Sequence, residues 1–194
     1  MLGDLWRVID LHYLILSALL FLIGMYVGPT AVERDIAFLL KYPRWMFGIM
    51  RRWVEHRRGF GKIFLLIFLA NNLSLFSSFA SGLVIVGPVL AAFMTGFNVA
   101  VISFDLMGWR SLWFTLINPV AWLEFPAAWL SFALGFKLAE YQWLHGDFAA
   151  TWQYLLSLLP VYGKYVMSLL LIAAVLETAI IVATDRLSGG SGEE

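Results

Sequence analysis

The chain has 194 residues, of which 61% are hydrophobic, 16% aromatic and 13% charged, and its 13 basic side chains balance 13 acidic ones. Soluble domains carry about 25% charged residues, so this chain has too few charges to cover a water-exposed surface. The absence of net charge excludes a nucleic-acid-binding domain, and the absence of cysteine excludes disulfides and thiolate metal sites. The composition predicts an all-α fold, a polytopic helical membrane protein.

A helix that crosses a membrane needs about 20 mostly apolar residues. We expect about five such spans in a single transmembrane domain over residues 1–186, followed by a flexible tail over 187–194 that is rich in Gly, Ser and Glu. The fourth span is longer than one crossing requires. The number of spans therefore changes if residues 111–117 form a re-entrant piece. The predicted spans are residues 11–28, 63–83, 84–104, 112–139 and 165–184.

Residues 30–62 form a basic amphipathic segment between the first two spans. Apolar residues recur there at helical spacing, and most charged residues fall on the opposite face. This pattern is typical of helices that lie in the membrane interface with arginine towards anionic lipid, although a docking surface for a cytoplasmic partner is the alternative. A second segment, residues 147–159, is too short to cross easily and is expected to be an interfacial or re-entrant helix. The basic residues expected to contact lipid or a partner are Arg51, Arg52, Arg57 and Arg58.

Lysine and arginine in short loops set the orientation of a membrane protein. Eight of them lie within residues 29–62, and placing this segment inside puts Arg110 and Arg186 inside as well. Three basic residues then remain outside. The distribution predicts a multi-pass protein of the cell membrane with its N-terminus outside and its C-terminus in the cytoplasm.

Several polar residues fall within the predicted spans, where a carboxylate costs roughly 2.5–3.5 kcal/mol on insertion scales and usually faces protein or trapped water. Stripes of small residues, such as Ser74, Ser78 and Gly82, predict close helix contacts, so that Asn71 or Asn72, Asn98 and Glu124 could meet. For Glu124, a hydrogen-bonded structural role and a role with a proton, ion or substrate both stay open. The predicted polar core comprises Asn71, Asn72, Asn98, Asn118, Glu124 and Glu177.

Two prolines are expected to break the fourth span. Proline removes a backbone donor, so Pro119 leaves a carbonyl near residues 111–115 without its helical partner, and Pro126 is expected to interrupt the helix again. In lipid, such a carbonyl must find a partner in protein or in trapped water. Broken helices of this kind often line sites in transporters, and they also occur as plain kinks.

The polar positions occur in an ordered set of motifs. They are IFLANNLSLF (67–76), SGLVIVGP (81–88), TGFNVAVISFDLMG (95–108) and NPVAWLEFPAAWLSFALG (118–135). Over roughly residues 63–138 this arrangement resembles the stage II sporulation protein M (SpoIIM) family of integral membrane proteins, most specifically in the Glu-x-Pro-Ala element of Glu124, Pro126 and Ala127. The family's usual Pro-His-Gly before that Glu is Asn118-Pro119-Val120 in this chain. The resemblance implies a membrane protein whose function depends on partners, because the member in spore-forming bacteria scaffolds cell-wall-remodelling enzymes and most relatives have no agreed activity.

These observations favour a non-enzymatic membrane scaffold or a subunit of a larger complex, with the lipid bilayer and protein partners or a second copy as its contacts. The alternative is a transporter, channel or permease-type subunit that uses Glu124. No catalytic residue, metal site or cofactor is predicted, because the three histidines fall at span ends or in loops and no span carries two carboxylates.

Overall fold

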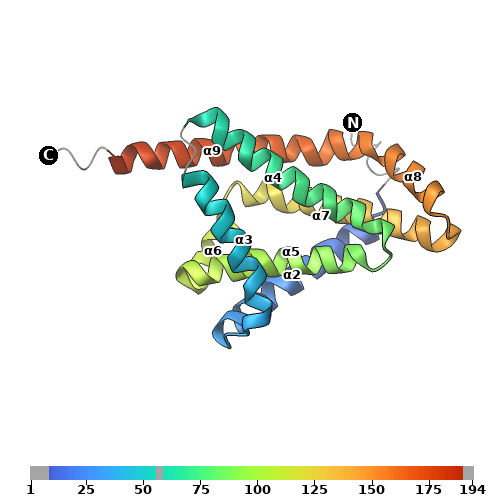
Figure 1. The fold of residues 1–194 in the computed structure, drawn as a ribbon, viewed down its shortest axis with the longest axis horizontal. Helices are drawn as coiled ribbons and strands as arrows, with labels where there is room; N and C mark the ends of the chain where they lie inside the picture. The colour runs from blue at the N-terminus through green and yellow to red at the C-terminus, as the bar shows by residue number, and fades with distance from the viewer. Residues whose placement is uncertain (1–8, 56–58, 190–194) are drawn as a thin grey trace.

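The computed structural model describes residues 9–55 and 59–189, and within these ranges the chain is helical and contains no strand (Figure 1). The predicted all-α class is confirmed. In chain order the elements are α2 (Leu11–Glu33), α3 (Ala37–Glu55), α4 (Phe60–Ala80), a 3₁₀ turn (Ser81–Leu83), α5 (Gly87–Met107), α6 (Trp109–Ile117), α7 (Ala121–His145), α8 (Phe148–Val161), a π-helical turn (Tyr162–Met167) and α9 (Ser168–Gly189).

Four helical segments of the described chain are long and apolar enough to cross a membrane: Leu11–Glu33, Phe60–Leu83, Gly87–Met107 and Phe148–Thr184. The expected count of about five is therefore approximate. The remaining long helix, α7, has 25 residues but is less apolar than the other four. The chain is a helical membrane protein.

Helix α7 lies at the centre of the bundle. It packs against α2, α4, α5, α6, α8 and α9, and Figure 1 shows it between the pair formed by α4 and α9 and the pair formed by α2 and α5. Its middle is almost fully buried, from Ala127 through Ala139. Because protein covers most of this helix, its sequence can hold polar side chains that a lipid-facing helix would exclude.

The predicted fourth span is two helices. Pro119 lies between α6 and α7, where the chain leaves helical geometry at Asn118. The break expected at Pro126 is wrong, because α7 continues through this residue. A proline inside a membrane helix removes one hydrogen bond, which neighbouring helices and side chains can compensate, so a helix packed on all sides can persist.

The predicted interfacial segment and the last span are joined. The helix that begins at Phe148 continues past Pro160 through the π-helical turn into α9, with a bend that Figure 1 shows between α8 and α9. A wider turn accommodates the missing N–H of proline without ending the helix. The predicted segment of residues 147–159 is helical, but it is continuous with the last span instead of separate from it. Its predicted start near Asp147 is correct, because the Asp147 carboxylate accepts the backbone N–H of Ala149 at 2.8 Å.

The basic segment of residues 30–62 also differs in its bounds, since α2 continues to Glu33 and α4 begins at Phe60. Between them α3 runs across α5 at a steep angle (Figure 1). Its first half is held by Leu40, which is fully buried against Phe97 and Val101 of α5. Arg44 adds a bidentate ion pair to Asp105, with Nε and Nη2 at 2.7 and 2.9 Å from the two carboxylate oxygens.

Helices α2 and α5 approach to backbone contact. A Cβ at Gly24 would collide with the carbonyl oxygen of Phe93, and a Cβ at Gly96 would collide with that of Phe21. The GxxxG pattern of Gly24 and Gly28 therefore has the role expected of small residues in membranes, which is to let helix backbones touch.

Candidate intramembrane polar site

Glu124, in the first turn of α7, has a hydrogen-bond partner on α4. The Nδ2 atom of Asn71 donates a hydrogen bond of 2.7 Å to Oε1 of Glu124, and both side chains are partly buried. Asn71 lies in the middle of α4, so the bond joins the middle of this helix to the first turn of α7. Of the two asparagines expected as candidate partners, the structure selects Asn71.

A third helix brings a second carboxyl group to this position. Helix α9 packs against both α4 and α7, and the carboxyl group of Glu177 lies close enough to that of Glu124 for an electrostatic interaction. The structure thus brings together three of the six predicted polar residues, one from each of three helices. We call Asn71, Glu124 and Glu177 the polar triad.

The contact between α4 and α7 continues beyond the polar triad along the predicted stripes of small residues. Ser131 Oγ donates a 2.6 Å hydrogen bond to the carbonyl oxygen of Leu75. Further along, a Cβ at Gly82 would collide with the backbone of Gly135. The close approach predicted from these stripes is confirmed, and the order of the contacts shows that α4 and α7 run in the same direction.

The other three asparagines lie elsewhere. The side-chain amide of Asn72 donates to the backbone carbonyl oxygen of Phe68, one turn earlier. The backbone carbonyl oxygen of Asn72 accepts a hydrogen bond from the hydroxyl of Tyr162 at 3.2 Å. Asn98 makes no hydrogen bond to Glu124, and its Oδ1 atom is buried without a partner. The expectation that Asn98 would join Glu124 is wrong: Asn98 lies on α5, and although α5 packs against α7, Glu124 is hydrogen-bonded to Asn71 of α4.

Asn118 organises the break between α6 and α7. Its Oδ1 accepts the backbone N–H of Val120 at 3.0 Å and so satisfies one donor at the start of α7. The indole Nε1 of Trp122 donates to the carbonyl oxygen of Leu116 at 2.9 Å, which supplies a partner for a carbonyl freed by the break. The sequence indicated the unsatisfied carbonyl but gave no sign that Trp122 would satisfy it.

Ion pairs around two basic residues, one at each end of the bundle, were not predicted. Lys137 Nζ lies 2.6 Å from Asp10 and 3.2 Å from Glu140, which ties the start of α2 to α7. This hydrogen bond lowers the pKa of the Asp10 carboxyl below its ordinary value. At the opposite end, the hydrogen bond to Asp105 raises the pKa of Arg44 further above its ordinary value. Only the Lys137–Glu140 pair, three positions apart on one helix, had a signal in the sequence.

The residues predicted to contact lipid or a partner lie on the second half of α3. Arg51 and Arg52 are exposed, and Arg52 Nε also donates to the carbonyl oxygen of Gly48 at 3.0 Å. Arg57 and Arg58 fall outside the described residues.

The chemistry available at the polar triad is that of two carboxyl groups and an amide. Across residues 9–55 and 59–189, no three His, Asp or Glu side chains lie close enough together to hold a metal ion. The hydrogen bond from Asn71 to Glu124 can fasten α4 to α7, and a carboxyl group can also exchange a proton.

The comparisons with known proteins identify a family. Residues 17–180 match the family model described as Stage II sporulation protein M, a match that extends well beyond the segment that carries the motifs. Among curated proteins nothing matches the chain, and the same holds among solved structures. Since the family match covers far more than half of the 194 residues, the chain belongs to the SpoIIM family.

Proposed function

We propose that this chain is a non-enzymatic membrane scaffold or a subunit of a larger complex. The observation that carries this proposal is that polar groups along α4 and α7 bind one another. Asn71 holds Glu124, and Ser131 holds the carbonyl of Leu75. A central helix fastened to its neighbour in this way supports a fixed platform that presents its ends to partners, as the resemblance to a scaffold family also implies.

The test is purification of the full chain from its native membranes in a mild detergent, followed by light scattering and mass spectrometry. We expect a particle that contains a second protein or a second copy of this chain at a fixed ratio. The particle should survive the Glu124→Gln substitution, because Gln retains an oxygen that accepts the hydrogen bond from Asn71. A chain that is always recovered alone would overturn the proposal.

A transporter or permease-type subunit is the second candidate, and the proximity of Glu124 and Glu177 favours it. Two carboxyl groups that interact inside a membrane are typical of proton pathways. The test is proton flux into vesicles that contain the purified chain and a pH-sensitive dye. Flux that is lost in Glu124→Gln and kept in Glu140→Gln, a matched change at the far end of α7, would establish this alternative.

We further infer that α7 is a fifth crossing. Trp122 and Trp143, near its two ends, are 71% and 72% exposed. They are 21 residues apart, which corresponds to about 31 Å along a helix and matches the thickness of the hydrocarbon, about 30 Å. Tryptophan is enriched at both interfaces of a membrane, so the spacing supports one crossing between these residues.

The orientation follows from the distribution of charge. The α3–α6 end of the bundle contains the last residue of α2 with the turn after it, α3, the start of α4, the end of α5 and α6 (Figure 1). The α7–α8 end contains Asp10 before α2, the last part of α7 from Lys137, the turn between α7 and α8, and the π-helical turn. Among side chains that the structure describes, the α3–α6 end has seven basic and three acidic groups, and the α7–α8 end has two basic and three acidic groups. The positive-inside rule therefore supports a cytoplasmic α3–α6 end.

A further inference from the structure

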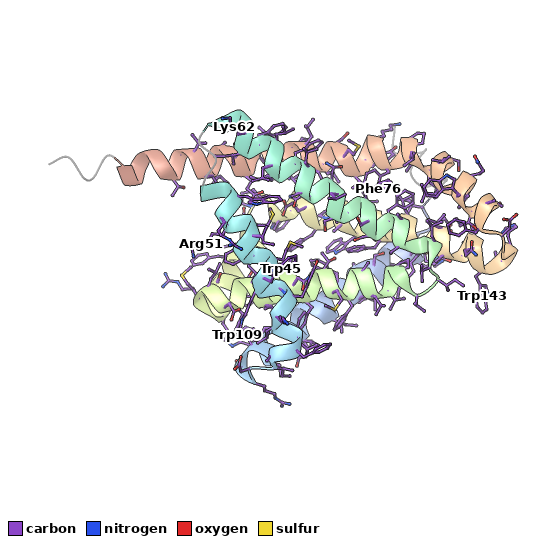
Figure 2. The ribbon with its side chains drawn as sticks, in the orientation of Figure 1. Trp45, Arg51, Lys62, Phe76, Trp109 and Trp143 are labelled. Atoms are coloured by element: carbon purple, nitrogen blue, oxygen red, sulfur yellow. The ribbon has the colours of Figure 1, made fainter. Side chains whose placement is uncertain are left out.

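Exposed basic side chains from three separate elements gather at the α3–α6 end. They come from α3, from the first turn of α4 and from the first turn of α6, and Figure 2 shows Arg51 and Lys62 in this part of the molecule. We call them the basic collar: Lys41, Arg51, Arg52, Lys62 and Arg110. Only Arg51 and Arg52 belonged to the predicted surface, so the fold adds three residues to it.

The acidic groups at this end are mostly engaged elsewhere. Asp105 forms the bidentate pair with Arg44, and Asp35 lies 3.4 Å from the same guanidinium. Among the described side chains at this end, seven basic groups still outnumber three acidic ones, so the end carries a net positive charge.

Exposed aromatic rings lie among the residues of the basic collar. Trp45 on α3 is 57% exposed, and Trp109 and Trp113 on α6 are 54% and 65% exposed. Figure 2 shows Trp45 and Trp109 at the same end of the bundle as Arg51. The guanidinium of Arg110 also lies over the ring of Phe114, 5.6 Å from its centroid. Aromatic and basic side chains mixed at one depth are typical of the headgroup layer of a membrane.

We propose that the basic collar binds the phosphate groups of anionic phospholipids in the leaflet at the α3–α6 end. Charge complementarity selects an anionic occupant. The exposed tryptophans select a lipid over an acidic soluble protein, because these large apolar rings share the surface of α3 and α6 with the basic groups and are stabilised by the headgroup layer. The steep crossing of α3 over α5 spreads its basic residues along the membrane plane instead of through its depth (Figure 1).

The experiment measures lipid preference in vesicles of phosphatidylcholine that contain the full chain. Spin-labelled phosphatidylglycerol and spin-labelled phosphatidylcholine are added in separate samples, and electron paramagnetic resonance gives the fraction of each that is immobilised by protein. We expect the chain to prefer phosphatidylglycerol, and we expect this preference to weaken at high salt because surface charge is screened within about 10 Å at 0.1 M.

A variant with all five collar residues replaced by Gln should lose the preference for phosphatidylglycerol several-fold. The matched control carries Arg51→Lys, Arg52→Lys and Arg110→Lys, which keep the charge, and should retain the preference. No preference in the unmodified chain, a preference that is indifferent to salt, or one that survives the Gln substitutions would overturn the proposal. So would an acidic soluble protein that binds the chain in neutral vesicles and depends on the same five residues.

Discussion

The hydrogen bond from Asn71 to Glu124 joins two side chains 53 positions apart on different helices. Glu124→Leu leaves the buried amide without its acceptor and should lower the free energy of unfolding by about 1–3 kcal/mol. Glu124→Gln should change it by less than about 0.5 kcal/mol, because the hydrogen bond remains possible. Both changes in the free energy of unfolding can be measured by monitoring unfolding in detergent with circular dichroism.

The matched control for this prediction is the double variant Asn71→Leu with Glu124→Leu. Removing both partners leaves no unsatisfied amide, so the double change should cost less than the sum of the two single changes. Strict additivity would show that the two side chains do not stabilise each other.

Asp10 and Lys137 provide a prediction that depends on pH. Because the pKa of Asp10 is lowered in the folded chain, its ionised form stabilises the fold above the ordinary aspartate value of about 3.9, and this stabilisation is lost as the pH falls through the folded-state value. Asp10→Asn should lower the melting temperature slightly at pH 7, by an amount equivalent to less than about 1 kcal/mol because both side chains are partly exposed. The difference from the parent chain should shrink at pH 3, and an unchanged difference would contradict this account.

The sequence identified Glu124 and its class of partner but not the partner itself. Asn71 and Asn72 are adjacent, so their side chains point about 100° apart around α4, and the rotation of α4 decides which of them meets α7. Asp10 could not be connected with Lys137 either, since 127 positions separate them. Periodicity along one helix carries no information about its rotation relative to a neighbour.

At the scale of elements, the contact between α2 and α5 depends on glycine. Gly96→Ala places a Cβ against the carbonyl oxygen of Phe21, which has no side-chain freedom to move, so the two helices must separate. We expect a loss of about 1–3 kcal/mol in the free energy of unfolding. Gly48→Ala is the matched control, because a Cβ there meets nothing within 4 Å and alanine is the better helix former. Equal melting temperatures for the two variants would contradict the close approach.

Element boundaries were predicted less well than element contacts. Residues 160–164, which include Pro160, lie between the predicted segment 147–159 and the predicted span 165–184, but the π-helical turn keeps the chain helical through them. Pro126 indicated a break that the packing of α7 prevents. In both places the local signal was correct about a missing hydrogen bond and wrong about its effect, because contacts with other helices decide whether a helix survives the loss.

At the scale of the whole molecule, the path of α7 determines which loops share a side of the membrane. The chain has no native cysteine, so single cysteines can be labelled without background. Arg110→Cys and Lys62→Cys should react with an impermeant reagent from the cytoplasmic side only, and His145→Cys from the opposite side only. Labelling at positions 110 and 145 from the same side would show that α7 does not cross.

The position of α7 at the centre of the bundle also constrains how the protein is made. This helix is less apolar than the four that surround it, and it carries Glu124 and Lys137. By the time it leaves the ribosome, α2, α4 and α5 have been synthesised, whereas α8 and α9 have not. The polar groups of α7 find partners on those earlier helices, so its entry into the membrane depends on helices that are already there. If α7 crosses the membrane as proposed, we expect its insertion to be coupled to folding, so substitutions that disrupt α4 or α2 should first reduce the amount of protein inserted.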